Sequence, residues 1–482
     1  MKETISLSVI VPVYNEEYLL EESLNRLFVI TDSPYISKVQ VVVVDDASND
    51  GTVIIIEKLS RELPSKNGLF NWCFIKHEQN KGKGEAIKTA LQFLTGDITI
   101  IHDADLEYFP SDITRMIPLF ITEHADAVYG SRFLPHEYRR VLMFRHELGN
   151  RLITFLSNLF SNLNLTDVET CYKAIKTDLL KSIPLHSADF RFEIEITMKL
   201  AKRKARIFEM PITYSGRTYE EGKKIKWPDG FKALWAIIKY GFSDDIFTED
   251  NYGGRILARL SEAEKFNRWM VDMFIPYVGQ NVLEIGAGIG TVTKKVIPRK
   301  RYYATDINEY YLTSINSLKE NKPYLNVTYL NVNDVASFKK TQGHFDTIIC
   351  LNVIEHVDDD ALALRNIADL LENNGRAVIL VPRGAWLFGS LDEVVGHRRR
   401  YSKKMLESLA QTARLDIITI IPFNRISVIP WYLNGKVLKK RTFGLFQIYV
   451  MNHLTPLLRV IDKFIPLPSL SFIAIMEKKP QP

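Results

Sequence analysis

Two acidic residues separated by one alanine follow a short apolar run in the first half of the chain. Asp103 and Asp105 come just after residues 98–101, whose apolar character is typical of a buried strand. Carboxylates at this spacing can converge on one divalent cation, which in turn can bind a diphosphate. On its own such a pair is usually a solvated loop. In this position it predicts a site for Mg²⁺ or Mn²⁺.

Three more polar segments follow strand-like runs before this pair. They are residues 11–17 (VPVYNEE), 45–52 (DDASNDGT) and 80–86 (NKGKGEA). Acidic groups in the second segment can accept hydrogen bonds from a nucleobase N–H or from ribose hydroxyls. Glycines in the third let the backbone approach phosphates, and its lysines supply positive charge. Four such segments in order, each at the end of a strand, favour a nucleotide-binding site in an α/β sheet.

Together these segments resemble family 2 inverting glycosyltransferases of the GT-A fold, especially the dolichol-phosphate mannosyltransferase-like branch. The resemblance covers about residues 5–240 and also rests on residues 130–133 (GSRF) and 217–225 (RTYEEGKKI). It implies a nucleotide-sugar site formed by Pro12, Tyr14, Glu16, Asp45, Asp46, Lys83 and Asp103. It implies that the metal is held by Asp103, Asp105 and Glu107, and that the catalytic residues are Asp105, Arg132, Arg217 and Lys223. The branch often has Gln where Glu107 stands, so we expect a more anionic metal site.

The nature of the acceptor decides whether the first half needs a general base. A polyprenyl phosphate is already anionic, so it needs only positioning and charge stabilisation. A sugar hydroxyl needs a carboxylate base, and the candidates are Asp167, Glu193 and Glu195. His77 and His102 lie at strand ends, and we expect both to be structural.

A second glycine-rich turn follows the apolar run 282–285. Its glycines stand at positions 286, 288 and 290, and Thr291 occupies the place where a dehydrogenase fingerprint needs glycine. Asp306 ends the next strand-like run and can bind ribose hydroxyls. Asp334 and Asn352 follow the third and fourth runs.

This pattern resembles class I S-adenosylmethionine-dependent methyltransferases over about residues 265–420 plus the final strand. The resemblance implies that S-adenosylmethionine is bound by Glu284, Gly286, Gly288, Gly290, Asp306, Ile307, Asp334 and Asn352. A neutral hydroxyl acceptor would benefit from a base, and His356 and His397 are the candidates. The alternatives are a local hydrogen bond for His356 and, for His397 with its neighbouring arginines, a phosphate contact or a solvated loop.

The fold class is therefore expected to be α/β, with two doubly wound domains in tandem. We expect a GT-A glycosyltransferase at residues 1–243, a linker at 244–264 and a Rossmann-like methyltransferase at 265–482. Residues 424–467 form a helical insertion before the last strand. This insertion either packs on its own domain or faces lipid.

Composition restricts the setting in which the protein acts. The chain has 482 residues, a net charge of +5 and three cysteines, which we expect to be buried, reduced thiols of a cytoplasmic protein. We expect no signal peptide and no membrane-spanning helix, and therefore attachment at most to the inner face of the plasma membrane. Nothing in the pattern favours nucleic-acid binding.

The sequence thus predicts a bifunctional enzyme. Its first domain would transfer a sugar from a nucleotide sugar to a polyprenyl phosphate or glycolipid, and its second would methylate a glycan or lipid-linked product. One alternative acceptor is a sugar hydroxyl of a cell-surface polysaccharide. In another alternative, one domain is inactive and serves as a binding platform.

Overall fold

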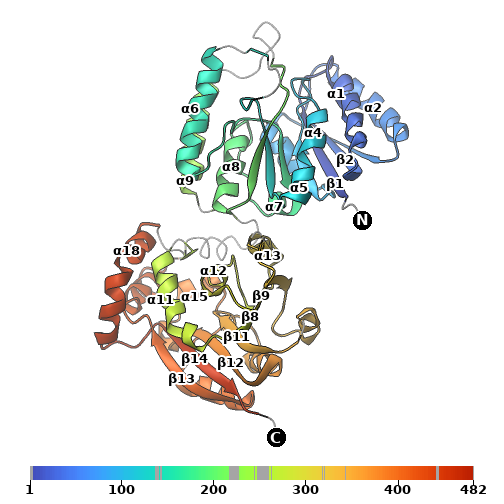
Figure 1. The fold of residues 1–482 in the computed structure, drawn as a ribbon. Coiled ribbons are helices and arrows are strands. Elements are labelled where there is room, and N and C mark those ends of the chain that lie inside the picture. The colour runs from blue at the N-terminus through green and yellow to red at the C-terminus, as the bar shows by residue number, and fades with distance from the viewer. Residues whose placement is uncertain are drawn as a thin grey trace. The chain divides into compact units, whose positions relative to one another are not determined.

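The chain forms two compact units, which are described separately (Figure 1). The computed structural model describes residues 4–135, 140–141, 144–216, 227–243, 245–246, 260–261, 263–316, 318–319, 321–341, 343–440 and 445–480. The first unit comprises Met1–Thr248 and the second Glu249–Pro482. This division falls inside the stretch 244–264 that we predicted as a linker, most of which lies outside the described residues.

The first unit is built on a seven-stranded sheet with the order β3-β2-β1-β4-β6-β5-β7. All neighbouring strands are parallel except β6, which runs antiparallel to β4 and β5. Both faces of the central strands are buried, as their near-continuous apolar sequences require. The strands are β1 (Ile5–Val13), β2 (Ile36–Asp45), β3 (Phe70–Lys76), β4 (Ile98–Ile101), β5 (Ala127–Ser131), β6 (Lys173–Lys176) and β7 (Ile207–Pro211).

Helices connect these strands. They are α1 (Leu20–Arg26), η1 (Leu27–Asp32), α2 (Thr52–Lys66), α3 (Lys83–Leu91), α4 (Ser111–Met116), α5 (Pro118–Thr122), α6 (Phe144–Ser161), α7 (Thr177–Lys181), α8 (Phe192–Lys202) and α9 (Trp227–Phe242). The long helices α6, α8 and α9 pack against one another. Helices α1, η1 and α2 connect strands that lie side by side in parallel, as in doubly wound folds.

The second unit has its own seven-stranded sheet, with the order β10-β9-β8-β11-β12-β14-β13. Only β14 is antiparallel, and it pairs with both β12 and β13. The strands are β8 (Asn281–Ile285), β9 (Arg301–Asp306), β10 (Leu325–Tyr329), β11 (Phe345–Leu351), β12 (Leu371–Pro382), β13 (Leu415–Phe423) and β14 (Ser471–Lys478). Inserting the last strand beside β12 makes the sheet mixed rather than fully parallel.

The helices of the second unit include those of the predicted insertion. They are α11 (Glu264–Phe274), η2 (Ile275–Tyr277), α12 (Thr293–Val296), α13 (Glu309–Asn316), η3 (Val335–Lys340), α14 (Asp360–Leu370), η4 (Ala385–Leu387), α15 (Ser390–Val395), α16 (Lys403–Thr412), α17 (Val428–Tyr432), the π-helical η5 (Leu433–Val437), α18 (Leu445–Ile461) and η6 (Asp462–Phe464). Helix α18 packs on α11. Among the described residues, no helix combines the length and apolar character that crossing a bilayer requires.

The fold class is the one that the sequence predicts, with three additions. Strands β6, β7 and β13 were not predicted, because their positions depend on pairing with strands distant in the sequence. The cysteines are free thiols, but Cys73 is only half-buried, which corrects the expectation that all three are buried.

The strand registers bring each set of predicted site residues to one edge of a sheet. In the first unit Val13 of β1 pairs with Asp45 of β2, and Ile10 of β1 pairs with Ile101 at the end of β4. In the second unit Ile285 of β8 lies beside both Thr305 of β9 and Cys350 of β11. The loops that leave these strands therefore open on a common edge, which is where open α/β sheets bind ligands.

Candidate active sites

The two neighbouring acidic residues at the end of β2 have different surroundings. The carboxylate of Asp46 is fully engaged, since it contacts the His77 ring at 2.7 Å and accepts hydrogen bonds from the backbone N–H groups of Lys81 and Gly82. Asp45 accepts one hydrogen bond, from Ser48 N at 3.0 Å. Its Oδ2 is buried without a hydrogen-bond partner among the described residues. Asp45 therefore has the oxygen that can receive a donor from a ligand.

The glycines of the segment 80–86 serve packing inside the protein. Gly82 has φ +96°, and a Cβ there would lie 2.4 Å from the carbonyl oxygen of Ala188. A Cβ on Gly84 would lie 2.2 Å from the carbonyl oxygen of Ser187. The start of α3 thus presses against the backbone that precedes α8, and this contact alone accounts for both glycines.

Lys83 joins the segment 80–86 to the first acid of the Asp103/Asp105 pair. Its ammonium lies 2.9 Å from Oδ1 of Asp103 and 3.3 Å from Oε1 of Glu193, and Glu193 also pairs with the buried Lys173 at 2.6 Å. Burial disfavours the charged form of Lys83, but the combined effect of its acidic neighbours, led by Asp103, outweighs burial and raises the pKa of Lys83 well above its usual value. Burial likewise opposes ionisation of Asp103, and Lys83 lowers the pKa of that carboxyl. The four charges therefore compensate one another.

The three residues predicted to bind a metal are not gathered around one point. Asp103 faces Lys83, whereas the carboxylate of Glu107 accepts a hydrogen bond from the Tyr214 hydroxyl at 2.6 Å. Asp105 Oδ1 accepts one from the backbone N–H of Glu107 at 3.2 Å, across a turn in which Leu106 has φ +62°. Their ligand oxygens do not all lie within 4.8 Å of one another. The metal assignment stays a prediction.

Arg132 forms a bidentate ion pair with Asp167. The guanidinium Nε lies 2.6 Å from Oδ2 and Nη2 lies 2.7 Å from Oδ1, and the ring of Tyr214 lies under the guanidinium. Asp167 is fully buried, so its first role is to hold Arg132 in position. Two other predicted catalytic residues, Arg217 and Lys223, lie outside the described residues.

The candidate bases at 193 and 195 are likewise bound in ion pairs. Glu193 contacts Lys83 and Lys173, and Glu195 contacts Lys199 at 2.8 Å. Glu195 also accepts hydrogen bonds from the backbone N–H groups of His186 and Ser187. Carboxylates held in this way are poor bases, because protonation would break these contacts.

Glu169 is a candidate that the sequence interpretation missed. It is half-buried, and burial raises its pKa to about 7, with Arg132 opposing and Asp167 reinforcing the shift. No ion pair within the described part of the chain involves its carboxyl. A carboxyl that titrates near neutral pH can take up a proton during a reaction. Sequence alone offers no signal for this, since burial, the largest cause of the shift, is set by the fold.

The remaining predicted residues of the first site lie around the β1–α1 loop. Pro12 is half-buried in β1, Tyr14 is partly exposed, and Glu16 is buried where its backbone N–H donates to Thr52 Oγ1. His77 and His102 are buried and hydrogen bonded on both ring nitrogens, which is the structural role that we expected. Burial lowers the pKa of His102 to about 4.

In the second unit, Asp306 fixes the glycine-rich turn. Its Oδ2 accepts a hydrogen bond from Gly288 N at 2.8 Å and its Oδ1 accepts one from Asn308 N at 2.9 Å. The turn needs glycine because residues 286, 288 and 290 all have positive φ, and because a Cβ on Gly286 would lie 2.3 Å from a methyl group of Val353. Each oxygen of Asp306 keeps a lone pair that a ribose hydroxyl could use.

Glu284 points into the protein rather than toward the turn. Its Oε2 accepts hydrogen bonds from the hydroxyls of Thr293 and Tyr302, the latter at 2.8 Å. Burial raises the pKa of Glu284 to about 7, and these two hydrogen bonds only partly oppose the shift. Glu284 thus links β8 to β9 and to α12, and its predicted contact with a cofactor stays a prediction.

The other predicted cofactor residues line the same edge of the sheet. Asn352 follows β11 with φ +53° and is exposed, as are Ile307 after β9 and Asp334 before η3. The Asp334 side chain accepts a hydrogen bond from Ala336 N and caps that short helix. These side chains are accessible from the edge where the glycine turn lies.

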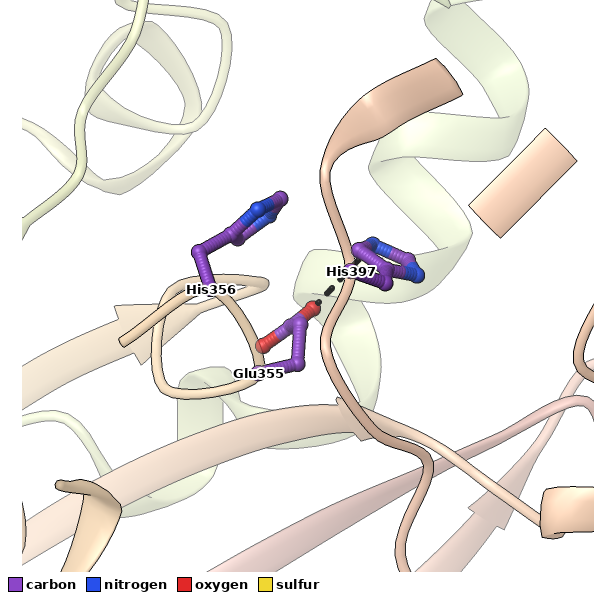
Figure 2. A group of neighbouring side chains, drawn as sticks. All are labelled: Glu355, His356 and His397. Atoms are coloured by element: carbon purple, nitrogen blue, oxygen red, sulfur yellow. Dashed lines mark ion pairs between the residues drawn. The ribbon is translucent and has the colours of Figure 1, made fainter. Parts of the chain in front are cut away.

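A second cluster of functional groups stands beside Asn352. Figure 2 shows the carboxylate of Glu355 directed toward the imidazole of His397, with the imidazole of His356 nearby; the two histidines are 41 residues apart in the sequence. Glu355 is fully buried, its Oε1 lies 3.6 Å from His397 Nε2, and neither of its oxygens has a hydrogen-bond partner among the described residues. Burial raises the pKa of Glu355 to about 8. The sequence indicated the two histidines, but not the carboxylate between them.

The arginines that follow His397 hold this cluster together. Arg398 Nε donates to the carbonyl oxygen of His356 at 2.8 Å, and Arg399 Nη1 pairs with Asp360 at 2.9 Å. Arg400 is buried and pairs with Asp392 at 2.8 Å. Each of the three therefore binds a group of the protein itself, and Arg398 is in addition exposed to solvent.

Comparison with known sequences identifies both halves. The pattern described as "Glycosyl transferase family 2" matches residues 8–183, and that of a "Methyltransferase domain" matches residues 283–377. The chain is 31% identical to the undecaprenyl-phosphate mannosyltransferase of Micrococcus luteus, over 44% of this chain and 85% of that protein. It is 29% identical to the UDP-N-acetylglucosamine–dolichyl-phosphate N-acetylglucosaminyltransferase of Methanococcus voltae, over 48% of this chain and 94% of that protein.

Solved structures similar to each half show lower identity. Glucosyl-3-phosphoglycerate synthase of Mycobacterium tuberculosis, in complex with Mn²⁺, UDP and phosphoglyceric acid, is 18% identical with a TM-score of 0.38, over 49% of this chain and 79% of that one. The N-methyltransferase NodS of Bradyrhizobium japonicum, in complex with S-adenosylhomocysteine, is 14% identical with a TM-score of 0.30, over 45% of this chain and 87% of that one.

Burial of Glu284 predicts a pH dependence of stability. The folded state holds this proton up to about pH 7, whereas the unfolded chain releases it near the ordinary value of 4.5. Between these values the folded state binds more protons, so its contribution to stability is complete below pH 4.5 and is lost as the pH rises through 7. This loss amounts to on the order of 3 kcal/mol in the free energy of unfolding, and we expect Glu284→Gln to abolish it. Pulse proteolysis in urea at several pH values measures the free energy of unfolding, and the fragment sizes distinguish the two units.

Glu372→Gln is the matched control, because Glu372 is exposed on the same unit. This variant should keep the pH dependence of the unsubstituted protein. An unchanged slope in Glu284→Gln would show that Glu284 is ionised in the folded state.

Proposed function

Because this chain belongs to glycosyl transferase family 2 through its first unit and carries a methyltransferase domain in its second, we propose a two-step activity on one lipid-linked product. The first unit transfers a sugar from a nucleotide sugar to a polyprenyl phosphate or glycolipid. The second unit methylates that glycan or lipid-linked product with S-adenosylmethionine as the methyl donor. The relatives from Micrococcus luteus and Methanococcus voltae, whose names specify polyprenyl phosphates, support this acceptor class.

The unpartnered oxygen of Asp45 supports a nucleotide at the end of β2. A nucleobase N–H or a ribose hydroxyl would satisfy it, whereas Asp46 is occupied in holding the loop 80–84. Mg²⁺ or Mn²⁺ is commonly bound through one or two carboxylates plus substrate phosphates. Asp105, with Asp103 or Glu107, fits that donor set. The cation would neutralise charge on the departing nucleoside diphosphate, and Arg132 is already oriented by Asp167 to assist.

An exposed apolar surface carries the proposal of a lipid acceptor. Helices α6 and α9 pack against each other (Figure 1), and both expose large apolar side chains at spacings of three and four residues. We call this the α6–α9 surface; it consists of Leu148, Leu152, Phe155, Leu159, Phe231, Trp235, Ile238 and Phe242. Lys239 lies over the Trp235 ring at 4.9 Å, a pairing suited to a membrane interface. Exposed apolar side chains at these spacings on two packed helices favour contact with lipid.

The second unit has a comparable surface of its own. The insertion 424–467 exposes apolar residues on η5, α18 and η6 that include Val437, Leu438, Leu457, Val460 and Phe464. Exposed lysines 436, 439 and 440 flank the first two of these. Apolar groups next to basic ones suit the headgroup region of an anionic membrane. We therefore propose that the protein lies at the inner face of the plasma membrane.

The structure gives less information about the acceptor of the methyl group than about the acceptor of the sugar. The glycine turn, Asp306 and Asn352 support binding of S-adenosylmethionine, whose sulfonium is a ready electrophile, so positioning of the acceptor supplies most of the catalysis. Tethering two domains raises the concentration of the first product near the second site. This argument supports a shared substrate, and it disfavours a role of either domain as a mere binding platform.

One observation favours a second candidate acceptor. A sugar hydroxyl of a polysaccharide needs a base, and Glu169, with a pKa of about 7, suits that role better than the ion-paired Asp167, Glu193 or Glu195. The lipid phosphate is preferred because the α6–α9 surface has no function in transfer to a soluble glycan.

The lipid acceptor is tested with labelled nucleotide sugars, Mn²⁺ or Mg²⁺ and a short polyprenyl phosphate. We expect label to enter the organic phase, and we expect Asp105→Ala to lower the rate by a factor of about 100 or more, because cation binding is lost. Asp32→Ala, at an exposed position of the same unit, should keep full activity. Nucleotide-sugar hydrolysis without lipid labelling would contradict the proposal and favour Glu169-dependent transfer to a saccharide.

Membrane contact is tested by flotation with vesicles that contain anionic lipid. We expect the double substitution Leu152→Glu and Phe155→Glu to weaken binding about ten-fold or more, because each apolar side chain contributes about 1.5–3 kcal/mol when buried. Ile54→Glu is the control, since Ile54 is 71% exposed but lies on α2 of the same unit. Equal losses in both variants, or none in either, would contradict a role of the α6–α9 surface.

Coupling of the two steps is tested with the purified product of the first reaction and methyl-labelled S-adenosylmethionine. We expect label to enter that product. Asp306→Ala should abolish cofactor binding and methylation but leave sugar transfer unchanged, because Asp306 lies in the other unit. If the protein methylates other glycans and ignores its own product, the shared substrate is wrong.

A further inference from the structure

The Glu355 carboxylate is buried without a hydrogen-bond donor for either oxygen among the described residues, unlike the neighbouring buried acid Asp392. Asp392, nearby, accepts hydrogen bonds from His397 and Arg400. Glu355 has none for either oxygen within the described residues, although it is completely shielded from solvent. An uncompensated buried carboxylate is costly, and native proteins keep such groups where a ligand completes them. The groups near it are the imidazoles of His356 and His397 (Figure 2).

The hydrogen bonds of both imidazoles prepare them as ligands. His397 Nδ1 lies 2.8 Å from Asp392 Oδ1, and His356 Nδ1 lies 3.2 Å from the carbonyl oxygen of Gly396. An oxygen acceptor at Nδ1 places the proton on that nitrogen and leaves Nε2 as the basic one. A carboxylate that orients the imidazole in this way is the usual second partner of a metal-bound histidine. Asp392 thus holds His397 with Nε2 toward Glu355.

We propose that Glu355, His356 and His397 form a site for a divalent transition-metal ion, with Zn²⁺ as the best match. Two imidazoles and one carboxylate are a known ligand set for zinc with an open fourth position. The three ligand atoms lie within 4.8 Å of one another. Ligands of a tetrahedral zinc ion lie about 3.3 Å apart, so small side-chain rotations would close the site. This site is distinct from the oxygen-rich one proposed in the first unit.

The position of the site suggests its role, which rests on the proposed methyltransferase function. Glu355 follows Asn352 by three residues at the end of β11, the edge where we propose that the methyl donor binds. An acceptor hydroxyl bound at the open position would lose its proton to solvent more readily. Its oxygen would then form a bond to the methyl carbon as the carbon–sulfur bond breaks, giving a methyl ether and S-adenosylhomocysteine. The histidines then act as ligands rather than as general bases.

Metal binding is tested with Zn²⁺ and Co²⁺ on the full chain carrying Asp105→Ala, which removes the cation site proposed for the first unit. We expect one Zn²⁺ per chain, a rise in the unfolding temperature, and for Co²⁺ the strong visible absorption of a four-coordinate site. Adding Glu355→Gln or His397→Ala should raise the Zn²⁺ dissociation constant about 100-fold or more, which exceeds the effect of losing a supporting residue. His344→Ala, which removes an exposed histidine of the same unit, should change nothing.

Binding of S-adenosylhomocysteine by the same variants separates the two proposals. Retained binding shows that Glu355→Gln and His397→Ala are folded, so equal Zn²⁺ affinity in these variants and in His344→Ala would overturn the metal site. If Zn²⁺ binds as expected but S-adenosylhomocysteine does not bind the unsubstituted chain, the methyltransferase proposal fails while the metal site stands. Methylation that survives Zn²⁺ removal would overturn the role assigned to the ion.

Discussion

Compensation of buried charge at the edges of the two sheets is the constraint on which both candidate sites depend. In the first unit the acids are paired: Asp103 with Lys83, Glu193 with Lys173, and Asp167 with Arg132. Each pair joins two different segments of the unit, so removing one partner would leave a buried charge and cost about 3–5 kcal/mol. The same contacts that stabilise the unit therefore also fix the orientation of its predicted catalytic groups.

In the described part of the second unit the buried glutamates are not compensated by close ion pairs of this kind. Glu284 is buried with two hydroxyl donors and a raised pKa, and Glu355 is buried with no hydrogen-bond donor among the described residues. The first arrangement fits a carboxyl that keeps its proton and links two strands. The second fits a group that is completed only when a ligand is present. Two glutamates with similar burial thus differ in their partners: the protein supplies hydrogen-bond donors to Glu284 but not, among the described residues, to Glu355.

Local patterns predicted the strands that end in motifs, because parallel strands are apolar throughout and polar loops follow them. They did not predict β6 or β13, whose positions depend on pairing with strands distant in the sequence. The same limit applies to the sites. Asp45 and Asp46 are adjacent and chemically identical, so only the fold reveals which of them is engaged by the loop 80–84. The Glu355 cluster brings together two histidines 41 residues apart in the sequence, which no spacing rule predicts.

Lys83 and Asp103 already form an ion pair, so each of them competes with an incoming ligand for the other. A cation or a diphosphate that enters must exchange with a contact already made, so its measured affinity is the difference between two interactions rather than the strength of one. Once released, the ammonium can turn toward a phosphate while the carboxylate turns toward a cation. Nucleotide and metal would then bind more tightly together than either does alone, since a single exchange satisfies both.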